Sequence, residues 1–456
     1  MTTTLGILAA HAATRPRDWP TAALDGARRI VVDTLACILG GRGEEAPQAV
    51  AGAMRAWRAG GGAIDLVGGG TLPSPWAALA NGTAAHALDY DDVLEPMMGH
   101  ASAVLVPAVL ALAEERGKSG AQVLDALLIG FDVIAALGNA VMVEHYTRGW
   151  HSTLTLGAPG AAAACGRLIG LDATKMGAAI SAATSFSAGS KRQFGTAMKP
   201  THAGLAAQAG VMAAHLAEAG TTAAPDILDG PWSFIGLYTG PGAPGIGAIA
   251  ETLARPPAML AFGSWLKAYP CCASTHRPID ALLKLRQQHG IKPEDIAAIE
   301  AEVSIVVQRN LMYDRPTTPS EARFSLNHCL ALAAEGQVTL AGFAPEALAP
   351  RRDFWPRVAM KLDPTLSGSS TDETCTLRVT LRDNRALETV VKVPKGHPQA
   401  PLSEAELAAK LRDCVVYGGA PGSAADRLMD ELSALGTART LAPLTQALLT
   451  TRTPAA

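Results

Sequence analysis

The chain has 456 residues, of which 48% are hydrophobic and 17% are charged, with a formal net charge of −3. This is a globular composition, and it excludes a largely disordered chain. The 38 basic and 41 acidic residues are mixed along the chain, without the clustered positive charge that nucleic-acid partners require. The seven cysteines are scattered and form no CxxC pair, which argues against a disulfide framework or zinc ribbon and favours a reducing cytoplasm.

The first half of the chain predicts helices, because apolar residues recur every three or four positions. The N-terminus lacks a basic segment before its apolar stretch, so we interpret it as a first helix and not a signal peptide. Gly40 and Gly41 are expected to stop one helix, and Asp172 is expected to cap another. The longest apolar run, residues 103–113, is too short to span a bilayer, so no membrane partner is expected. Helices are predicted at residues 24–39, 102–116, 122–141 and 156–171.

The pattern changes after about residue 267. Residues 299–307 and 358–362 alternate between apolar and polar side chains, which predicts half-buried strands. Two further alternating stretches flank Asp383 and Asn384 and predict a β-hairpin. The hairpin strands are expected at residues 375–381 and 387–393, and helices are expected at residues 279–289 and 320–336.

Ser403 and Glu406 form a capping-box pair that predicts a new helix. The last sixty or so residues again have helical spacing. The sequence therefore predicts a mainly α protein with an α+β insertion. The expected organisation is a large helical domain built from both termini, residues 1–266 and 395–456, with a smaller α+β lid domain at residues 267–394.

Polar residues that could carry chemistry gather in five places. The first is the stretch from His86 to His100, which also holds Asp89 and two further aspartates. Acidic residues beside an apolar helix are costly to bury unless they are paired or functional. The simpler interpretation is a helix end whose aspartates are exposed to solvent. A further interpretation is a magnesium site formed by Asp89, Asp91 and Asp92.

The other four places are also ambiguous when they are taken singly. His151 precedes an apparent helix start, where free backbone N–H groups suit a ligand carboxylate, although a buried or capping histidine is the simpler interpretation. Residues 187–204 form either an anion clamp or a basic loop. Cys272 either faces a site or is simply buried. Tyr313 offers a phenol as a hydrogen-bond donor, and the arginines near it are expected to form structural ion pairs. No nucleotide-binding glycine loop, GxSxG or HExxH is present.

Taken together and in this order, these segments resemble the MmgE/PrpD family, whose members include dehydratases, decarboxylases and epimerases of small polycarboxylic acids. The resemblance covers nearly the whole chain. It is carried by residues 81–92, 149–151, 198–204, 267–272 and 274–276, and by the tail at residues 401–407.

This resemblance implies a helical domain plus an α+β lid, a homodimer, and a catalytic pocket between the domains without metal or organic cofactor. Residues Asp89, His100, His151, Lys199, Lys267 and Tyr313 correspond to pocket residues of the decarboxylase branch. The sequence departs from that branch at two positions. Val93 stands where a threonine is expected, and Cys272 stands where a catalytic histidine is expected.

The expected substrate is a small di- or tricarboxylate from which a proton next to a carboxylate is removed. His151 is the first choice of general base and Lys199 the second, and Tyr313 or Cys272 is the expected acid. The expected catalytic residues are His151, Lys199, Lys267, Asp89, Tyr313 and Cys272, and the expected substrate-binding residues are His100, Arg148, Arg192 and Tyr146, with no metal ligand.

Three activities fit these expectations. The leading one is a metal-independent lyase of the hydratase or dehydratase type. The main alternative is an epimerase or isomerase of a substituted succinate such as iminodisuccinate. A decarboxylase of the cis-aconitate type fits less well because of Cys272, and a binding protein without activity on the same scaffold is a further alternative.

Overall fold

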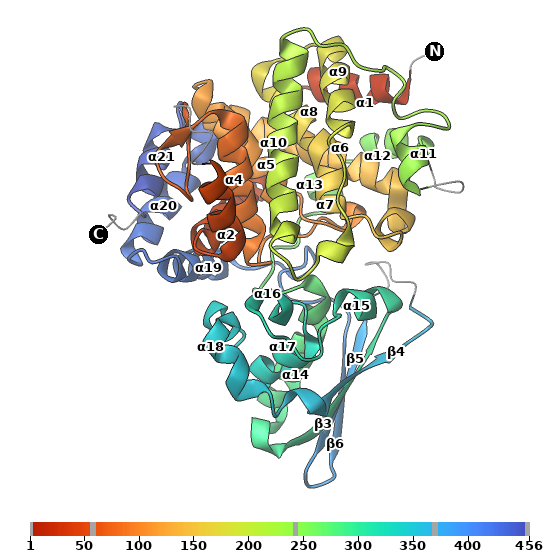
Figure 1. Cartoon of the computed structure of the whole chain (residues 1–456), viewed down its shortest axis with the longest axis vertical. Coiled ribbons are helices and arrows are strands. Elements are labelled where there is room, and N and C mark those ends of the chain that lie inside the picture. Colours follow the sequence, from red (N-terminus) through yellow and green to blue (C-terminus); the bar gives the residue numbers. More distant parts are fainter. Residues whose placement is uncertain (1–2, 55–60, 240–244, 367–372, 452–456) are drawn as a thin grey trace.

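The structure is a computed structural model that describes residues 3–54, 61–239, 245–366 and 373–451. Within these ranges a helical part lies above a smaller α+β part (Figure 1). Each part has its own hydrophobic core, one formed mainly by residues up to Leu266 and beyond Leu402, the other mainly by residues between Cys271 and Leu381. The protein is mainly α with an α+β portion, as the sequence predicts.

The helical part contains most of the regular structure. Its N-terminal α-helices are α1 (Thr4–Thr14), α2 (Thr21–Gly41), α3 (Glu45–Met54), α4 (Ser74–Ala87), α5 (Ser102–Glu115), α6 (Gly120–Thr147), α7 (Ser152–Thr155), α8 (Gly157–Ile169), α9 (Ala173–Thr184), α10 (Met198–Glu218), α11 (Phe234–Thr239), α12 (Gly247–Leu253) and α13 (Ala258–Ala261). Strands β1 (Ala63–Ile64) and β2 (Thr71–Leu72) form a short antiparallel pair. The predicted cap Asp172 is confirmed, since its side chain accepts a hydrogen bond from the backbone of Lys175.

Helix α6 is the longest helix, and its segment Gly120–Val141 is apolar and long enough to cross a membrane. In the structure, 89% of that segment's most apolar window is buried against other parts of the protein. Its apolar surface is therefore accounted for by the core, where it packs against α8.

Helices α4 and α10 pack against each other through small residues. A Cβ atom at Gly204 would lie 2.3 Å from the carbonyl oxygen of Leu79, and one at Gly82 would lie 2.9 Å from the Cα of Gly204. Only glycine allows the two backbones to come this close. This contact brings the end of α4, which carries His86, next to the start of α10, which carries Lys199.

Helix α2 ends at Gly41, as the sequence predicts, but the expected left-handed cap is wrong, because neither Gly40 nor Gly41 has a positive φ. A Cβ atom at Gly41 would lie 2.3 Å from the carbonyl oxygen of Ala84 in α4. The glycines are therefore explained by close helix packing and not by a left-handed cap.

The α+β part is built on a four-stranded sheet in the order β4-β3-β5-β6. Strands β3 and β4 are parallel, and the other two pairs are antiparallel. Helix α14 packs on β5 and β6, and α17 packs on α14. The elements are α14 (His276–His289), β3 (Ile296–Val303), α15 (Ile305–Asn310), α16 (Pro319–Ala322), α17 (Leu326–Glu335), α18 (Pro345–Leu348), β4 (Val358–Leu362), β5 (Cys375–Leu381) and β6 (Ala386–Val391).

The predicted β-hairpin is confirmed, with Asn384 in the left-handed region at φ 68°. The predicted strand at residues 299–307 is wrong at its end. Ser304 accepts a hydrogen bond from the backbone of Val307 and starts helix α15. The helix predicted at residues 320–336 is likewise divided, because Ser325 caps a separate helix, α17.

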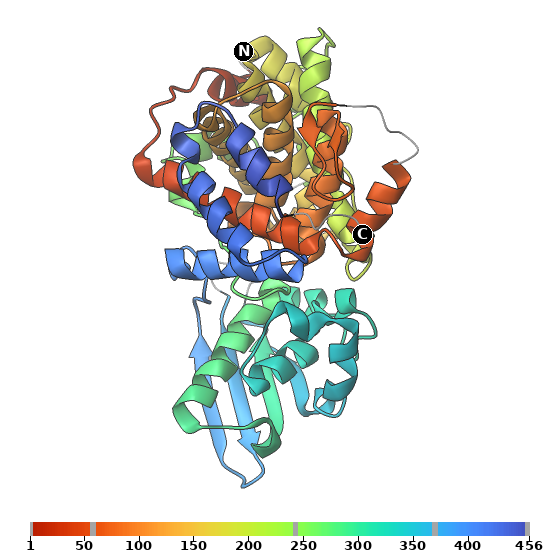
Figure 2. The same cartoon turned by 90° about the vertical axis from the view of Figure 1, so that its left-hand side faces the viewer.

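The chain returns to the helical part through α19 (Glu404–Tyr417), α20 (Ser423–Ser433) and α21 (Ala442–Leu449). The predicted capping box is confirmed: Ser403 and Glu406 exchange hydrogen bonds at the start of α19. Helix α19 packs against α2 and lies along the lower face of the helical part, next to the α+β part (Figures 1 and 2).

Candidate active site

A cavity of about 120 Å³ is lined by residues of both parts. The helical part contributes the loop after α4 and the starts of α7 and α10, and the α+β part contributes the segment before α14 together with α15. The polar and ionisable side chains that line it are Asp89, Glu95, His100, Tyr146, His151, Lys199, Trp265, Cys272, Ser274, Arg277, Asn310 and Glu373.

Three charged side chains form the centre of the site. Lys199 forms an ion pair with Asp89 Oδ1, and Lys267 Nζ lies 3.0 Å from Asp89 Oδ2 and 2.6 Å from the Asp89 carbonyl oxygen. Burial alone would raise the pKa of Asp89, but the two ammonium groups outweigh it and hold the pKa well below its usual value. With two cations and one anion, this group carries a formal charge of +1, which favours an anionic substrate.

The backbone of Asp89 is in the left-handed region, at φ 50°. Aspartate tolerates this conformation better than most residues, but it still costs free energy. It directly follows the end of α4 at Leu88 and turns the carboxylate toward the two lysines. Lys267 is fully buried and does not line the cavity, so it acts on the site by holding Asp89.

Two imidazoles lie beside this centre, and their hydrogen bonds fix their tautomers. The Lys199 ammonium lies 2.8 Å from His86 Nε2 and can only donate. His86 therefore carries its proton on Nδ1 and donates it to Asp91 Oδ2 at 2.8 Å. His100 Nδ1 lies 2.7 Å from the carbonyl oxygen of Asp92 and must also donate, which leaves His100 Nε2 for the cavity.

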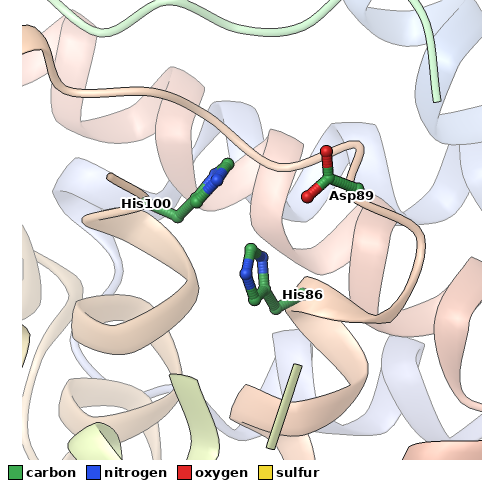
Figure 3. A group of neighbouring side chains, drawn as sticks. All are labelled: His86, Asp89 and His100. Atoms are coloured by element: carbon green, nitrogen blue, oxygen red, sulfur yellow. The ribbon is translucent and has the colours of Figure 1, made fainter. Parts of the chain in front are cut away.

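Figure 3 shows His86, Asp89 and His100 converging on one region, and their potential metal-ligand atoms lie within 4.8 Å of one another. The charges already present do not suit a metal ion. His86 Nε2 is occupied by the Lys199 ammonium, which also contacts Asp89. A divalent cation bound there would face that ammonium at close range, where the repulsion is large.

The alternative of a magnesium site formed by three aspartates is also not supported. Asp92 accepts hydrogen bonds from the backbone of Ser102 and the hydroxyl of Ser264, away from the cavity. Asp91 contacts imidazoles and Asp89 contacts lysines. The three carboxylates therefore have different partners and do not converge on one ion.

His151 lines the cavity and pairs with a second histidine, with 2.9 Å between His151 Nδ1 and His202 Nδ1. Burial, and then the nearby Lys199, hold the pKa of His151 well below its usual value. Its imidazole is therefore neutral near pH 7. When His151 donates from Nδ1 to His202, its Nε2 is left as a proton acceptor.

Cys272 also lines the cavity, and burial raises the pKa of its thiol to about 11, so this thiol keeps its proton near pH 7. Tyr146 donates a hydrogen bond to Asn310 Oδ1 at 3.1 Å, and Asn310 donates in turn to Ser274 Oγ at 3.2 Å. The ammonium of Lys191 lies 3.4 Å from the centre of the Tyr146 ring, a cation–π contact.

Arg277, in the first turn of α14, is the arginine that lines the cavity, and it is not among the site residues predicted from the sequence. It is 7% exposed, and its Nε donates to the carbonyl oxygen of Lys392 at 2.8 Å. Burial lowers its pKa, while Glu373 and Glu95 act in the opposite direction. Because the side chain lines the cavity, its guanidinium is a candidate group for binding a substrate carboxylate.

Six of the ten side chains predicted for the site line the cavity, namely Asp89, His100, Tyr146, His151, Lys199 and Cys272. Lys267 lies directly behind Asp89. The other three are placed elsewhere. Arg148 and Arg192 are exposed, and Tyr313 donates its hydroxyl to the carbonyl oxygen of Phe194 at 2.9 Å outside the cavity lining.

Ionisable side chains with displaced pKa values converge on one cavity, which is the arrangement of an enzyme active site. Residues 7–246 match the MmgE/PrpD N-terminal domain, and residues 269–433 match the MmgE/PrpD C-terminal domain. The chain therefore belongs to the MmgE/PrpD family, and it is an enzyme of the lyase type.

Relatives with assigned names span most of the chain. Cis-aconitate decarboxylase of Homo sapiens is 29% identical over 357 residues, which cover 75% of this chain and 72% of the relative. Cis-aconitate decarboxylase-like protein oryM of Aspergillus oryzae is 27% identical over 431 residues, 87% of each chain. Cis-aconitate decarboxylase of Aspergillus terreus is 29% identical over 293 residues, 60% of this chain and 58% of the relative.

The buried histidines make folding stability depend on pH. Burial lowers the pKa of His86 to about 3 and those of His145, His202 and His328 to about 4, from 6.5. The unfolded chain therefore binds more protons, and this stability is complete above pH 6.5 and is lost as pH falls toward 4. Asp33, whose pKa burial raises to about 6, opposes this trend.

We expect urea unfolding to show a free energy of unfolding that falls between pH 6.5 and 4.5. Each histidine contributes up to about 1.4 kcal/mol per pH unit. The variant His328→Gln keeps a donor for the carbonyl of Gly342 but does not titrate, so its slope should be smaller by about that amount. An unchanged slope would contradict the assignment of His328.

Proposed function

We propose that the enzyme removes a proton next to a carboxylate of a small di- or tricarboxylate and adds or eliminates water, without a metal ion. The observation that carries this proposal is one cavity that holds a neutral imidazole at His151, the Lys199 ammonium beside Asp89, and the Arg277 guanidinium. A base and two anion-binding groups are what proton abstraction from a polycarboxylate requires.

In the proposed reaction, His151 Nε2 takes the proton from the carbon next to a carboxylate. The electron pair of that C–H bond moves into the carboxylate, and the Lys199 ammonium stabilises the resulting negative charge. His202 holds the His151 ring through Nδ1. Lys199 is bound to Asp89 and His86, so we assign it this electrostatic role and not the role of base.

The leaving hydroxyl requires a proton, and the Cys272 thiol supplies it. The electron pair returns from the carboxylate to form a carbon–carbon double bond as the carbon–oxygen bond breaks, water forms, and a thiolate remains. The proton held by His151 returns to Cys272 through solvent and completes the cycle. Tyr313, the other acid considered, has its hydroxyl bound to the Phe194 carbonyl and is not used.

A second activity, epimerisation, is favoured by the same thiol. An epimerase needs one group that removes the proton and another that returns it to the opposite face. Neutral His151 and protonated Cys272 both line the cavity, so the pair meets this need for a substituted succinate. Decarboxylation, the activity in the names of the relatives, is a third outcome that the following experiment distinguishes.

The test is proton NMR in D₂O with EDTA present, on citrate, methylcitrate, cis-aconitate, malate, tartrate and substituted succinates. We expect deuterium to enter a C–H position beside a carboxylate. A change in mass by one water identifies a hydratase, a change in optical rotation alone identifies an epimerase, and loss of CO₂ identifies a decarboxylase. A folded protein that gives no exchange with any of these acids would contradict the proposal.

We expect substitution of Arg277 to weaken substrate binding more than it slows chemistry. Arg277→Met removes the second carboxylate contact and should raise KM about 10- to 100-fold with a small change in kcat. The matched control is Arg148→Met, because Arg148 is exposed and outside the cavity, and its kinetics should equal those of the wild type. Steady-state kinetics checks both. An unchanged KM for Arg277→Met would remove Arg277 from the binding site.

We further propose a homodimer in the cytoplasm. Exposed apolar side chains on the helical part support association, including Trp232, which is 86% exposed, and Leu237, which is 62% exposed. All seven cysteines are free and buried, which suits a reducing compartment. Light scattering after size-exclusion chromatography tests the dimer, and a mass near 46.9 kDa would contradict it.

A further inference from the structure

Lys410 is a fully enclosed lysine that the proposed reaction does not use. It lies in α19, more than 300 positions after the catalytic loop, and is 4% exposed. Its ammonium is 2.6 Å from Asp33 Oδ1 in α2 and 3.8 Å from the centre of the Tyr90 ring. Burial alone would lower the pKa of Lys410, but Asp33 raises it above the usual value, so the side chain remains charged.

The other two contacts of Lys410 are with the backbone of the site. Its ammonium donates to the carbonyl oxygen of Tyr90 at 2.7 Å and to the carbonyl oxygen of Lys267 at 3.0 Å. Tyr90 directly follows Asp89, and Lys267 binds Asp89 through both its carboxylate and its carbonyl oxygen. One ammonium therefore joins the two backbone segments that carry the central ion pair.

This link matters because Asp89 is held in an unfavourable backbone conformation, at φ 50°. A residue persists in such a backbone conformation only where the surrounding structure holds it there. The loop and the segment at Lys267 are joined directly by Lys267 on Asp89 and by paired backbone hydrogen bonds between Val93 and Trp265. Lys410 adds a link from a helix that does not line the cavity, and its one ammonium binds a carbonyl group of each segment.

We infer that Lys410 is a positioning residue of the active site, which holds Asp89 against Lys267 by fixing the carbonyl groups of Tyr90 and Lys267. The inference rests on the proposed function, in which Asp89 and Lys199 act as a unit. It assigns a role in catalysis to α19, which contributes no side chain to the cavity. A displacement of about 1 Å at such a centre lowers turnover by as much as 100-fold.

The test separates positioning from simple charge pairing. Lys410→Met alone leaves Asp33 buried without a counter-charge, so its Tm should fall. The double variant Asp33→Asn/Lys410→Met removes both charges, and its Tm should return toward that of the wild type. Its kcat should nevertheless stay about 10- to 100-fold below wild type, with KM changed less than about threefold. A double variant that regains wild-type kcat together with Tm would overturn the inference.

Two further measurements complete the design. Arg412→Met changes an exposed residue of the same helix that pairs with Asp426, and it should leave kcat unchanged. A crystal structure of the double variant needs no substrate, and the distance from Lys267 Nζ to Asp89 Oδ2 should exceed its present 3.0 Å and leave hydrogen-bond range. A retained distance of 3.0 Å overturns the positioning role. Wild-type protein without proton exchange overturns the proposed function instead, and the distance still decides on Lys410.

Discussion

Replacement of Lys199 by methionine is expected to lower kcat by about 10²- to 10³-fold, the effect of removing a donor aimed at developing charge. Lys199 is the ammonium that both lines the cavity and contacts Asp89. The fold should be retained, because Asp89 keeps its ion pair with Lys267. Steady-state kinetics and thermal unfolding measure the two effects separately.

The control for this variant is Lys175→Met, since Lys175 lies in α9 outside the cavity lining and its ammonium donates to the carbonyl oxygen of Glu218. Its kcat should equal that of the wild type. A Lys199→Met enzyme that is folded and keeps more than about a tenth of wild-type kcat would remove Lys199 from the proposed scheme.

Replacement of His151 by glutamine should lower kcat by about 10²- to 10⁴-fold, because an amide cannot accept the substrate proton. Deuterium exchange should be lost together with turnover, since both depend on the same step. The variant His202→Phe removes only the partner of Nδ1, and a smaller loss of about 10-fold or more is expected.

The exposed His289 provides the control His289→Gln, with no expected change in kcat or in exchange. Two results would contradict the assignment of His151 as base. One is undiminished deuterium exchange in His151→Gln. The other is a loss in His202→Phe that exceeds the loss in His151→Gln, because a positioning residue should not matter more than the base that it positions.

Periodicity predicted the fold well, because most helices bury one continuous apolar face and the pattern of that face is visible in the sequence. The errors occurred where one residue type serves two structures. Gly41 suits a left-handed cap and a close helix contact equally, and the position of Ala84 in the structure decides between them. Val307 suits a strand or a helix, and Ser304 determined the outcome by capping.

The structure places most of the predicted site residues from the family segments in one cavity, whereas contacts between distant segments were not predictable from the sequence. His86 was identified with its cluster, but its role depends on Lys199, which lies 113 positions away. Arg277 follows His276 in the sequence and belongs to no recognisable motif. Its burial in the cavity, visible only in the structure, distinguishes it from Arg148. Tyr313 was placed in the site by family position, and the structure directs its hydroxyl to a backbone carbonyl.

The packing of α19 against α2 has a consequence for how the protein is made. Helix α2 leaves the ribosome early, while the ammonium that neutralises Asp33 and fixes Tyr90 belongs to a residue translated 320 positions after Tyr90. The nascent chain therefore contains every residue that lines the cavity before it contains the residue that aligns them. Contacts of such long sequence separation form late and slowly. The alignment of the active site that we infer therefore cannot form before α19 has been translated.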